Sequence, residues 1–161
     1  MNSEFTIAVH CLLILSDTPD RICSSESLSA KVHTHPARIR KIMSLLRRRH
    51  LVETKEGLGG GYRLACDPAS CTLADVYRLT SCAALKLSWC SDPSTEDREM
   101  AAVHGVLERT FSRAENLLEN YLEHWTIDSL LKQIRTDRVS PRMAITDKFA
   151  DSQNNRIGGE G

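Results

Sequence analysis

Basic side chains are concentrated in one part of this 161-residue chain, although its total charge is balanced. The whole chain contains 21 Lys and Arg against 21 Asp and Glu, whereas residues 1–64 contain ten against six. Between Glu26 and Glu53 there are seven basic residues and no acidic one. Such a local field attracts a polyphosphate partner. The basic residues of this stretch are Lys31, Arg38, Arg40, Lys41, Arg47, Arg48 and Arg49.

Most of these residues are predicted to lie on one amphipathic helix within residues 34–50. Ile39, Ile42 and Leu46 recur at helical spacing and form an apolar stripe, which leaves the basic residues elsewhere on the helix surface. Pro36 suits a first helical turn, where its missing N–H is not needed, and Thr34 is the predicted N-cap. A short helix over residues 24–32 and a three-residue link come before it. This order is that of a helix-turn-helix.

In a helix-turn-helix, the N-terminal residues of the second helix enter the major groove of DNA. The candidates for base or near-base contact are therefore Pro36, Ala37, Arg40, Lys41 and Ser44, with Thr34 at the helix start. Arg47, Arg48 and Arg49 are predicted to contact phosphates. An isolated basic helix is more often simply solvated, so the residues after the helix decide between these two interpretations.

A glycine-rich hairpin is predicted directly after the basic helix. LVETK and YRLA are strand candidates, and EGLGGG joins them with four glycines in five residues. Glycine permits positive φ values and lets the backbone approach a partner closely. A nucleotide-phosphate loop is the alternative, but no GKS or GKT follows and the loop leads into a strand. We therefore interpret the hairpin as a DNA-contacting wing, with Lys55, Gly57, Gly59 and Gly60 as contact candidates.

A long helix is predicted near the other end of the chain, over residues 95–125. Its apolar positions are separated by three or four residues over about four heptads. A stripe of this length is explained by burial across a two-fold axis, and an antiparallel partner within the same chain is the alternative. A dimer would set two recognition helices about 34 Å apart on a palindromic operator. The predicted dimer interface comprises Val103, Leu107, Phe111, Ala114, Leu118 and Tyr121.

The remaining segments complete a mainly α fold with a small β-hairpin wing. An apolar helix over residues 5–15, a capped helix over 72–79 and a closing helix over 126–134 are predicted. Residues 1–80 are expected to form a winged helix-turn-helix domain, 81–94 a sensor or linker loop, and 95–134 the dimerisation helix with the closing helix. Little apolar periodicity follows, so residues 135–161 are predicted to be a mostly disordered tail.

The segment HPARIRKIMSLLRRRHLVETKEGLGGGYRLACDPASCTLADVY resembles the Rrf2 family of bacterial winged-helix transcription regulators. AVHCLLIL resembles the family's first helix, and HGVLERTFSRAENLLENYLEHWTIDSLL resembles its dimerisation helix and the short helix after it, so residues 3–134 are covered. The resemblance implies that Pro36, Arg38, Arg40 and Lys41 lie in the DNA-reading segment, with residues 57–61 at the wing tip. The family usually has a basic residue just before the glycine loop, where this chain has Glu56.

The cysteines raise the question of a regulatory signal. Several members of the family hold an iron–sulfur cluster on three closely spaced cysteines in the loop before the dimerisation helix. Here that loop contains Cys82 and Cys90, so a cluster would need His, carboxylate or partner-subunit ligands, and we expect no cofactor and no metal. Cys82 and Cys90 are instead candidates for a disulfide that responds to oxidation. The alternatives are ordinary thiols and a small-molecule effector.

The composition and the missing motifs limit the remaining functions. The chain has 41% hydrophobic and 26% charged residues, which is typical of a soluble globular protein. No apolar run of membrane-spanning length and no secretory signal are present, so we expect a cytoplasmic protein without a membrane partner. No catalytic constellation is found, which indicates a protein that is not an enzyme. We expect a homodimeric, sequence-specific DNA-binding repressor. A protein-interaction module that has lost strong DNA binding is the alternative, which Glu56 would permit.

Overall fold

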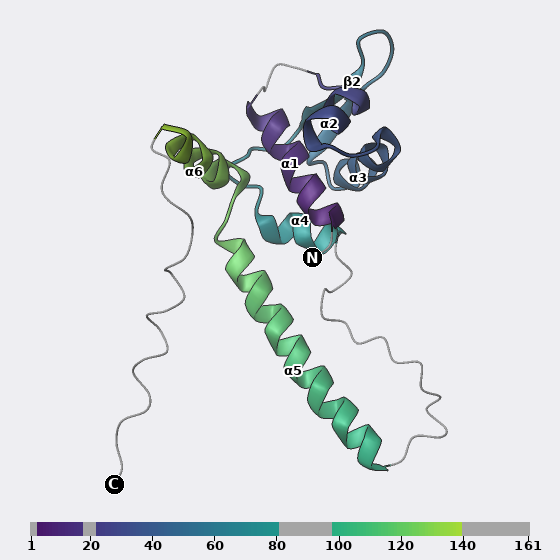
Figure 1. Ribbon diagram of the computed structural model, residues 1–161, viewed down its shortest axis with the longest axis vertical. Helices are drawn as coiled ribbons and strands as arrows, with labels where there is room; N and C mark the ends of the chain where they lie inside the picture. Colours follow the sequence, from purple (N-terminus) through teal and green to yellow (C-terminus); the bar gives the residue numbers. More distant parts are fainter. Residues whose placement is uncertain (1–2, 18–21, 81–97, 140–161) are drawn as a thin grey trace.

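The structure is a computed structural model that describes residues 3–17, 22–80 and 98–139. It confirms the predicted fold class, because the chain is mostly helical with one two-stranded antiparallel hairpin. Figure 1 shows a small helical domain that carries the hairpin at one end and a long helix at the other. The elements are α1 (Ser3–Asp17), α2 (Ser25–Val32), α3 (Pro36–Arg48), β1 (Val52–Lys55), β2 (Gly61–Leu64), α4 (Leu73–Thr80), α5 (Arg98–Glu123) and α6 (Ile127–Val139).

Helix α1 is the centre of the hydrophobic core. Its side chains are apolar on most faces, and it packs against α2, α3, α4 and α6. Leu12 and Leu15 are fully buried together with Leu28 of α2 and Ile39 of α3. Burial of such a side chain contributes about 1.5–3 kcal/mol relative to its exposure. The core therefore fixes the position of α3 from its inner side.

The turn between α2 and α3 is set by local capping. Ser24 caps α2 by accepting a hydrogen bond from the Ser27 N–H, and His33 ends the helix in the left-handed conformation, with φ of 54°. His35 caps α3, because its Nδ1 accepts a hydrogen bond from the Ala37 N–H at 3.3 Å. The prediction that Thr34 is this cap was wrong. Since Pro36 occupies the first helical position, the cap must be the residue directly before it.

The hairpin is tied to the helical core by a third short segment. Val52 pairs with Leu64 and Lys55 pairs with Gly61, so the register of β1 and β2 is antiparallel. Cys23 exchanges two 2.9 Å backbone hydrogen bonds with Tyr62, just before α2 begins. Strand β2 is consequently held against the helix-turn-helix, and the loop between the strands projects away from the domain (Figure 1).

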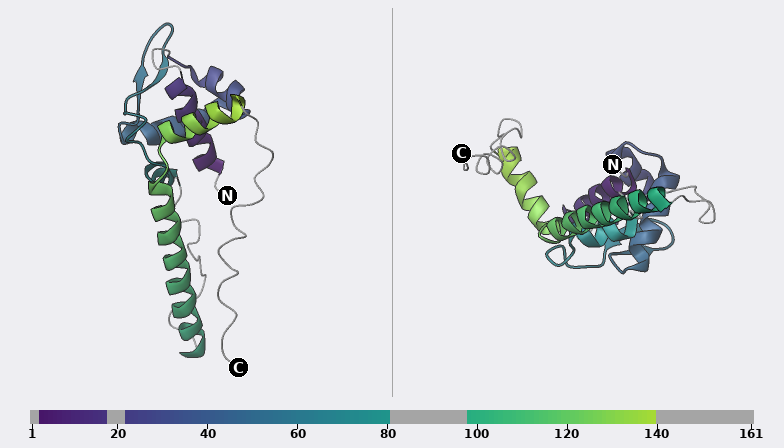
Figure 2. Two further views of the ribbon diagram at one scale, coloured as in Figure 1. Left: turned by 90° about the vertical axis from the view of Figure 1, so that its left-hand side faces the viewer. Right: turned by 90° about the horizontal axis from the view of Figure 1, so that it is seen from below.

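Helix α5 extends away from the domain, and helix α6 packs back against it. Helix α5 packs on α4 with its C-terminal part, and its N-terminal part projects beyond the domain (Figure 1 and Figure 2, left). Helix α6 returns to α1, where Ile127 and Leu131 join the core. The predicted end of this helix at residue 134 was wrong, since α6 continues to Val139. Arg135 holds the extra turn against α1 through a 2.8 Å ion pair with Asp17.

Residues 135–139 therefore do not belong to a disordered tail, and the remainder of that prediction, residues 140–161, lies outside the described residues. Within the described ranges, no helix combines the length and the apolar character needed to cross a membrane.

Candidate nucleic-acid interface

Helix α3 separates its apolar and basic side chains onto different faces. Ile39, Ile42, Met43 and Leu46 are fully buried against the domain. The predicted contact residues lie on the remaining surface, because a helical period of 3.6 residues cannot bury both sets. The exposed ones are Ala37, Arg38, Arg40, Lys41, Arg47 and Arg48, whereas Thr34, Pro36 and Ser44 are half-buried. The structure therefore brings the predicted recognition residues together on one exposed helix surface.

Two of these basic residues are paired with carboxylates from other helices. Arg40 lies 3.3 Å from Glu26 of α2, and Lys41 lies 2.7 Å from Glu4 of α1. Glu26 remains charged, since its pKa is lowered chiefly by a hydrogen bond from its own backbone N–H and next by the Ser25 hydroxyl. The Arg40–Glu26 pair is solvent-exposed and therefore weak. A phosphate or a base edge can replace this carboxylate at small cost, whereas the Glu4 side chain beside Lys41 is only 23% exposed.

The C-terminal end of α3 carries basic side chains that have no carboxylate partner among the described residues. Arg47, Arg48 and Arg49 are exposed and form no ion pair with any residue that the structure describes. Lys55 at the end of β1 is in the same state. These four cations differ from Arg63, which pairs across the hairpin with Glu53. An approaching polyanion meets these four side chains without first displacing a carboxylate.

The tip of the hairpin requires glycine for two different reasons. Gly57 and Gly59 have φ of 92° and 75°, which side chains other than glycine rarely adopt. A Cβ on Gly60 would lie 2.4 Å from the Lys55 carbonyl oxygen, inside the turn that the Gly60 N–H closes onto Gly57. Glu56 and Leu58 are exposed beside these glycines. The predicted wing is therefore present as a tight turn, with an acidic and an apolar side chain at its tip.

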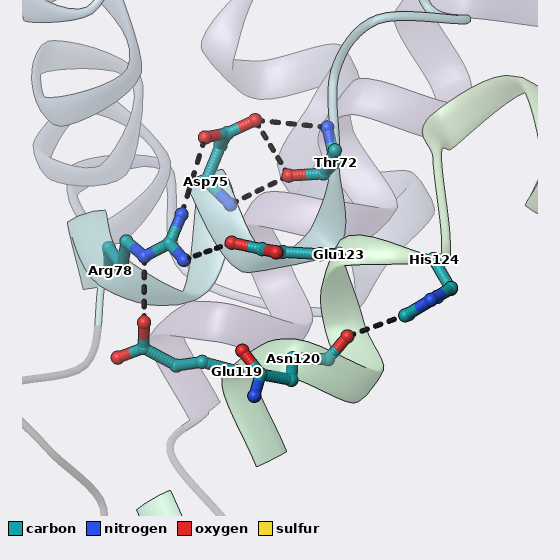
Figure 3. Close-up of polar contacts among 7 residues, drawn as sticks. All are labelled: Thr72, Asp75, Arg78, Glu119, Asn120, Glu123 and His124. Atoms are coloured by element: carbon teal, nitrogen blue, oxygen red, sulfur yellow. Dashed lines mark hydrogen bonds and ion pairs between the residues drawn. The ribbon is translucent and has the colours of Figure 1, made fainter. Parts of the chain in front are cut away.

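A cluster of ion pairs connects α4 with α5 and so joins the domain to its long helix (Figure 3). The Arg78 guanidinium contacts Glu119 at 2.8 Å and Glu123 at 2.6 Å, and it lies 3.8 Å from Asp75. Beside this cluster, the Tyr77 hydroxyl donates a hydrogen bond to the buried carboxylate of Glu115. Charged groups on one side of α5 thus fix the direction in which the helix leaves the domain.

The predicted dimer stripe lies on a different side of α5 from these carboxylates. Val103, Leu118 and Tyr121 remain 46%, 36% and 60% exposed, although they are apolar or aromatic. Leu107, Phe111 and Ala114 are half-buried. Among the described elements, α4 is the one packed extensively on α5, and it meets the helix only near its C-terminal end. No described antiparallel helix covers the stripe.

The candidate redox residues, Cys82 and Cys90, lie outside the described residues. Residues 81–97 contain these two cysteines and no third one, so the donor set does not fit a cluster held by three cysteines. Elsewhere, residues 3–17, 22–80 and 98–139 contain no group of three or more His, Cys, Asp or Glu that could hold a metal ion.

Several residues that shape the surface were missed by the sequence prediction. Glu4 and Glu26 were counted only as charges, although they contact Lys41 and Arg40 from other helices. The Ser3 hydroxyl accepts a hydrogen bond from Arg38 in the same way. These contacts join residues 14 to 37 positions apart, and no local sequence pattern marks them. The capping role of His35 did have a signal, which was the position of Pro36.

Known proteins resemble this chain in both sequence and structure. The Rrf2 family, described as iron-dependent transcriptional regulators, matches residues 1–133. BadM of Rhodopseudomonas palustris is 32% identical over 130 residues, which cover 81% of this chain and 80% of BadM. YwnA of Bacillus subtilis is 25% identical over 134 residues, which cover 83% and 98%. Both names describe HTH-type transcriptional regulators. A crystal structure described as a transcriptional regulator from Lactobacillus plantarum matches with a TM-score of 0.73 at 26% identity, over 84% of this chain and 91% of that one.

Proposed function

Because the chain belongs to the Rrf2 family of transcriptional regulators, we propose that it is a homodimeric, sequence-specific DNA-binding repressor. The observation that carries the proposal is the exposed basic surface of α3 beside a glycine-tipped wing. The family and the relatives are regulators of transcription, which are not enzymes. Binding to the chromosome also leads us to propose a cytoplasmic location.

In the proposed complex, α3 lies in the major groove and Arg40 reads a base. A guanidinium can donate two hydrogen bonds to the O6 and N7 atoms of guanine. Arg40 would exchange its contact with Glu26 for this pair. Lys41 and Ser44 lie further along the same helix, and Arg47 and Arg48 contact phosphates beyond it. The exchange favours a guanine over the other bases, because its O6 and N7 atoms together accept both hydrogen bonds.

The wing would contact the DNA backbone with Lys55 and the amides of Gly57, Gly59 and Gly60. Glycines at the tip keep the steric profile low, so the chain can approach the minor groove. Glu56 opposes this contact by repelling phosphates. We therefore assign most of the binding energy and all of the base recognition to α3, and a smaller positioning role to the wing.

Dimerisation would occur through the exposed apolar stripe of α5. The stripe is predicted to pair with its copy across a two-fold axis, which places two α3 helices on a palindromic operator. Repression would follow if the operator overlaps a promoter. The exposure of Val103 and Tyr121 supports this proposal, since large apolar groups rarely gather on an unpartnered surface.

The salt dependence of DNA binding tests the proposal and separates it from a protein-interaction module. The full chain is titrated with fluorescent DNA selected from a random-sequence library, over roughly 50–200 mM salt. If several phosphates are contacted, the logarithm of the association constant should fall linearly with the logarithm of the salt concentration. For six contacts the affinity should fall by about 10³-fold or more over this salt range. A protein that selects no DNA at the lowest salt would support the interaction module that the exposed Glu56 permits.

The signal that controls binding stays a prediction, with thiol oxidation and a small molecule as the two candidates. Oxygen-free purification, iron determination and a visible spectrum would test for a cluster, and we expect an iron-free, colourless protein. Alkylation of Cys82 and Cys90 before and after oxidation would test the predicted disulfide. Protection of neither cysteine after oxidation would leave the small-molecule alternative.

A further inference from the structure

The loop between β2 and α4 brings two other cysteines together. Asp67 begins a tight turn in which its carbonyl oxygen accepts hydrogen bonds from the Ser70 and Cys71 N–H groups, at 3.0 and 3.1 Å. Its carboxylate accepts a third hydrogen bond from the Ala69 N–H at 2.9 Å. The chain therefore reverses between Cys66 and Cys71, and the two thiols are close enough that each shifts the pKa of the other.

The two thiols have different environments. Cys66 is half-buried, whereas Cys71 is 2% exposed and belongs to the hydrophobic core. The pKa of Cys66 is lowered, first by the hydrogen bond from Cys71, although partial burial and the carboxylates of Asp67 and Asp75 oppose this shift. The pKa of Cys71 is raised, because it is the donor of that hydrogen bond and is buried. Cys66 is thus the accessible nucleophile and Cys71 the protected partner.

Cys11 and Cys23 provide an internal contrast. Both are buried in the core, and burial with the neighbouring Cys23 raises the pKa of Cys11 to about 12. A thiol in that environment is almost entirely protonated at neutral pH and shielded from solvent. Proximity of two cysteines alone therefore does not make a reactive site in this chain, and partial exposure distinguishes Cys66.

We propose that Cys66 and Cys71 form a reversible disulfide when the protein meets hydrogen peroxide. The Cys66 thiolate attacks one peroxide oxygen, so a sulfur–oxygen bond forms, the oxygen–oxygen bond breaks, and the leaving hydroxide takes up a proton as water. The Cys71 sulfur then attacks the Cys66 sulfenic acid. The sulfur–sulfur bond forms, and hydroxide leaves with the Cys71 proton as a second water. The two sulfurs together lose two electrons, which reduce the peroxide.

The turn that contains the two cysteines is hydrogen-bonded both to the base of the wing and to the start of α6. Ala65, directly before Cys66, donates a backbone hydrogen bond to Leu51 at 3.0 Å, at the base of the wing. The Cys71 carbonyl accepts one from Ile127 at 3.0 Å, where α6 begins. A disulfide fixes its sulfurs about 2.05 Å apart, which changes the turn between these anchors. An effect on DNA affinity rests on the proposed function, but the disulfide itself does not.

Peptide mapping of the full chain tests the proposal directly. Cleavage after Arg63 and Arg78 places both cysteines in one peptide, Leu64–Arg78, apart from every other cysteine. After brief hydrogen peroxide treatment and alkylation, we expect this peptide to be two hydrogens lighter than its reduced, unalkylated form and free of alkyl groups. Reductant should restore double alkylation. Recovery of the doubly alkylated peptide after oxidation, while other cysteines react, would overturn the proposal.

Two single variants test the order of the steps. In Cys71→Ser, Cys66 should accumulate a sulfenic acid that dimedone traps. In Cys66→Ser, Cys71 should react at least about tenfold more slowly than Cys66 does in Cys71→Ser, because it is buried and protonated. Equal rates would refute the assigned roles. Since the wild-type peptide map needs no DNA, a disulfide without DNA binding would contradict only the proposed function, and DNA binding without a disulfide would contradict only this inference.

Discussion

Arg40 contacts Glu26 in the structure and would exchange this partner for a base in the proposed complex with DNA. In the free protein its guanidinium contacts Glu26 and the Ser25 hydroxyl at 3.3 and 3.2 Å. More than half of the Arg40 side chain remains exposed, so the pair is solvent-screened and weak. The pair keeps the guanidinium oriented without preventing its transfer to a base.

Replacement of Arg40 tests its base-reading role. Arg40→Ala is expected to weaken binding to the selected DNA site by roughly 1–3 kcal/mol and to relax the preference at one base position. Fluorescence anisotropy and repeated site selection measure the two effects. Lys132→Ala removes a cation from α6 instead and should change neither. Unchanged affinity and base preference in Arg40→Ala would refute the role.

Replacement of Glu26 tests the opposite side of the same pair. Glu26→Gln removes one negative charge beside the recognition helix, so affinity for random-sequence DNA should rise and the ratio of specific to random binding should fall. The glutamate also lies at the positive end of α2, so its loss should lower the stability slightly. A fall in random-sequence affinity in the folded variant would contradict the proposed competition between Glu26 and DNA.

Sequence patterns predicted which α3 residues are exposed but not their partners. Exposure follows from periodicity, because Ile39, Ile42 and Leu46 determine the buried face. The contacts with Glu4 and Glu26 depend on how α1 and α2 pack, and packing is not encoded locally. The disagreement at Thr34 has another origin, because Pro36 fixes the helix start one residue later than a preference for threonine caps suggests.

Among the elements, the wing depends most strictly on its backbone. Gly60→Ala would place a Cβ 2.4 Å from a backbone oxygen of Lys55, which must move because it cannot rotate away. The strain should be on the order of 1–3 kcal/mol and confined to the hairpin. DNA affinity should fall severalfold while the helical circular dichroism is retained.

A glycine in α5 provides the matched control for this variant. A Cβ on Gly105 meets only the end of the Arg109 side chain, at 3.3 Å. Gly105→Ala should therefore stabilise the helix by about 0.5–1 kcal/mol and leave DNA affinity unchanged. If Gly60→Ala bound DNA like the wild-type protein, the wing would have no positioning role.

The sequence identified which segments are helical more accurately than it predicted where each helix ends. Apolar periodicity identified α1, α3 and α5 because each buries a stripe or most of its surface. The end of α6 was misjudged by five residues, because its last turns have little apolar content to mark them. Arg135 in this part of α6 pairs with Asp17 of α1, a contact between distant segments that a local pattern does not reveal.

At the scale of the whole molecule, two faces of α5 carry side chains of different kinds. Glu119 and Glu123 hold the helix to Arg78 of the DNA-binding part, and the apolar stripe remains open on another face. The stripe was predictable from its heptad spacing. The Arg78 cluster was not, because nothing in the sequence relates residue 78 to residues 41 and 45 positions further on.

Charged substitutions in the stripe test dimerisation. The double variant Val103→Asp and Leu107→Asp should be monomeric in analytical ultracentrifugation, because two carboxylates cannot be buried against their copies without a large desolvation cost. Its affinity for a palindromic site should fall by about tenfold or more. Asn116→Asp adds a charge at an exposed position of α5 outside the stripe and should remain dimeric. A dimeric double variant would assign the interface to another surface.

Footprinting on a site selected from random DNA is the most direct test of the central claim that two α3 helices read one symmetric operator. We predict two protected half-sites related by a dyad, with centres about one helical turn (about 34 Å) apart, and loss of the major-groove protection in Arg40→Ala. A single unsymmetric footprint, or a symmetric footprint that survives Arg40→Ala with the same base preference, would contradict this account.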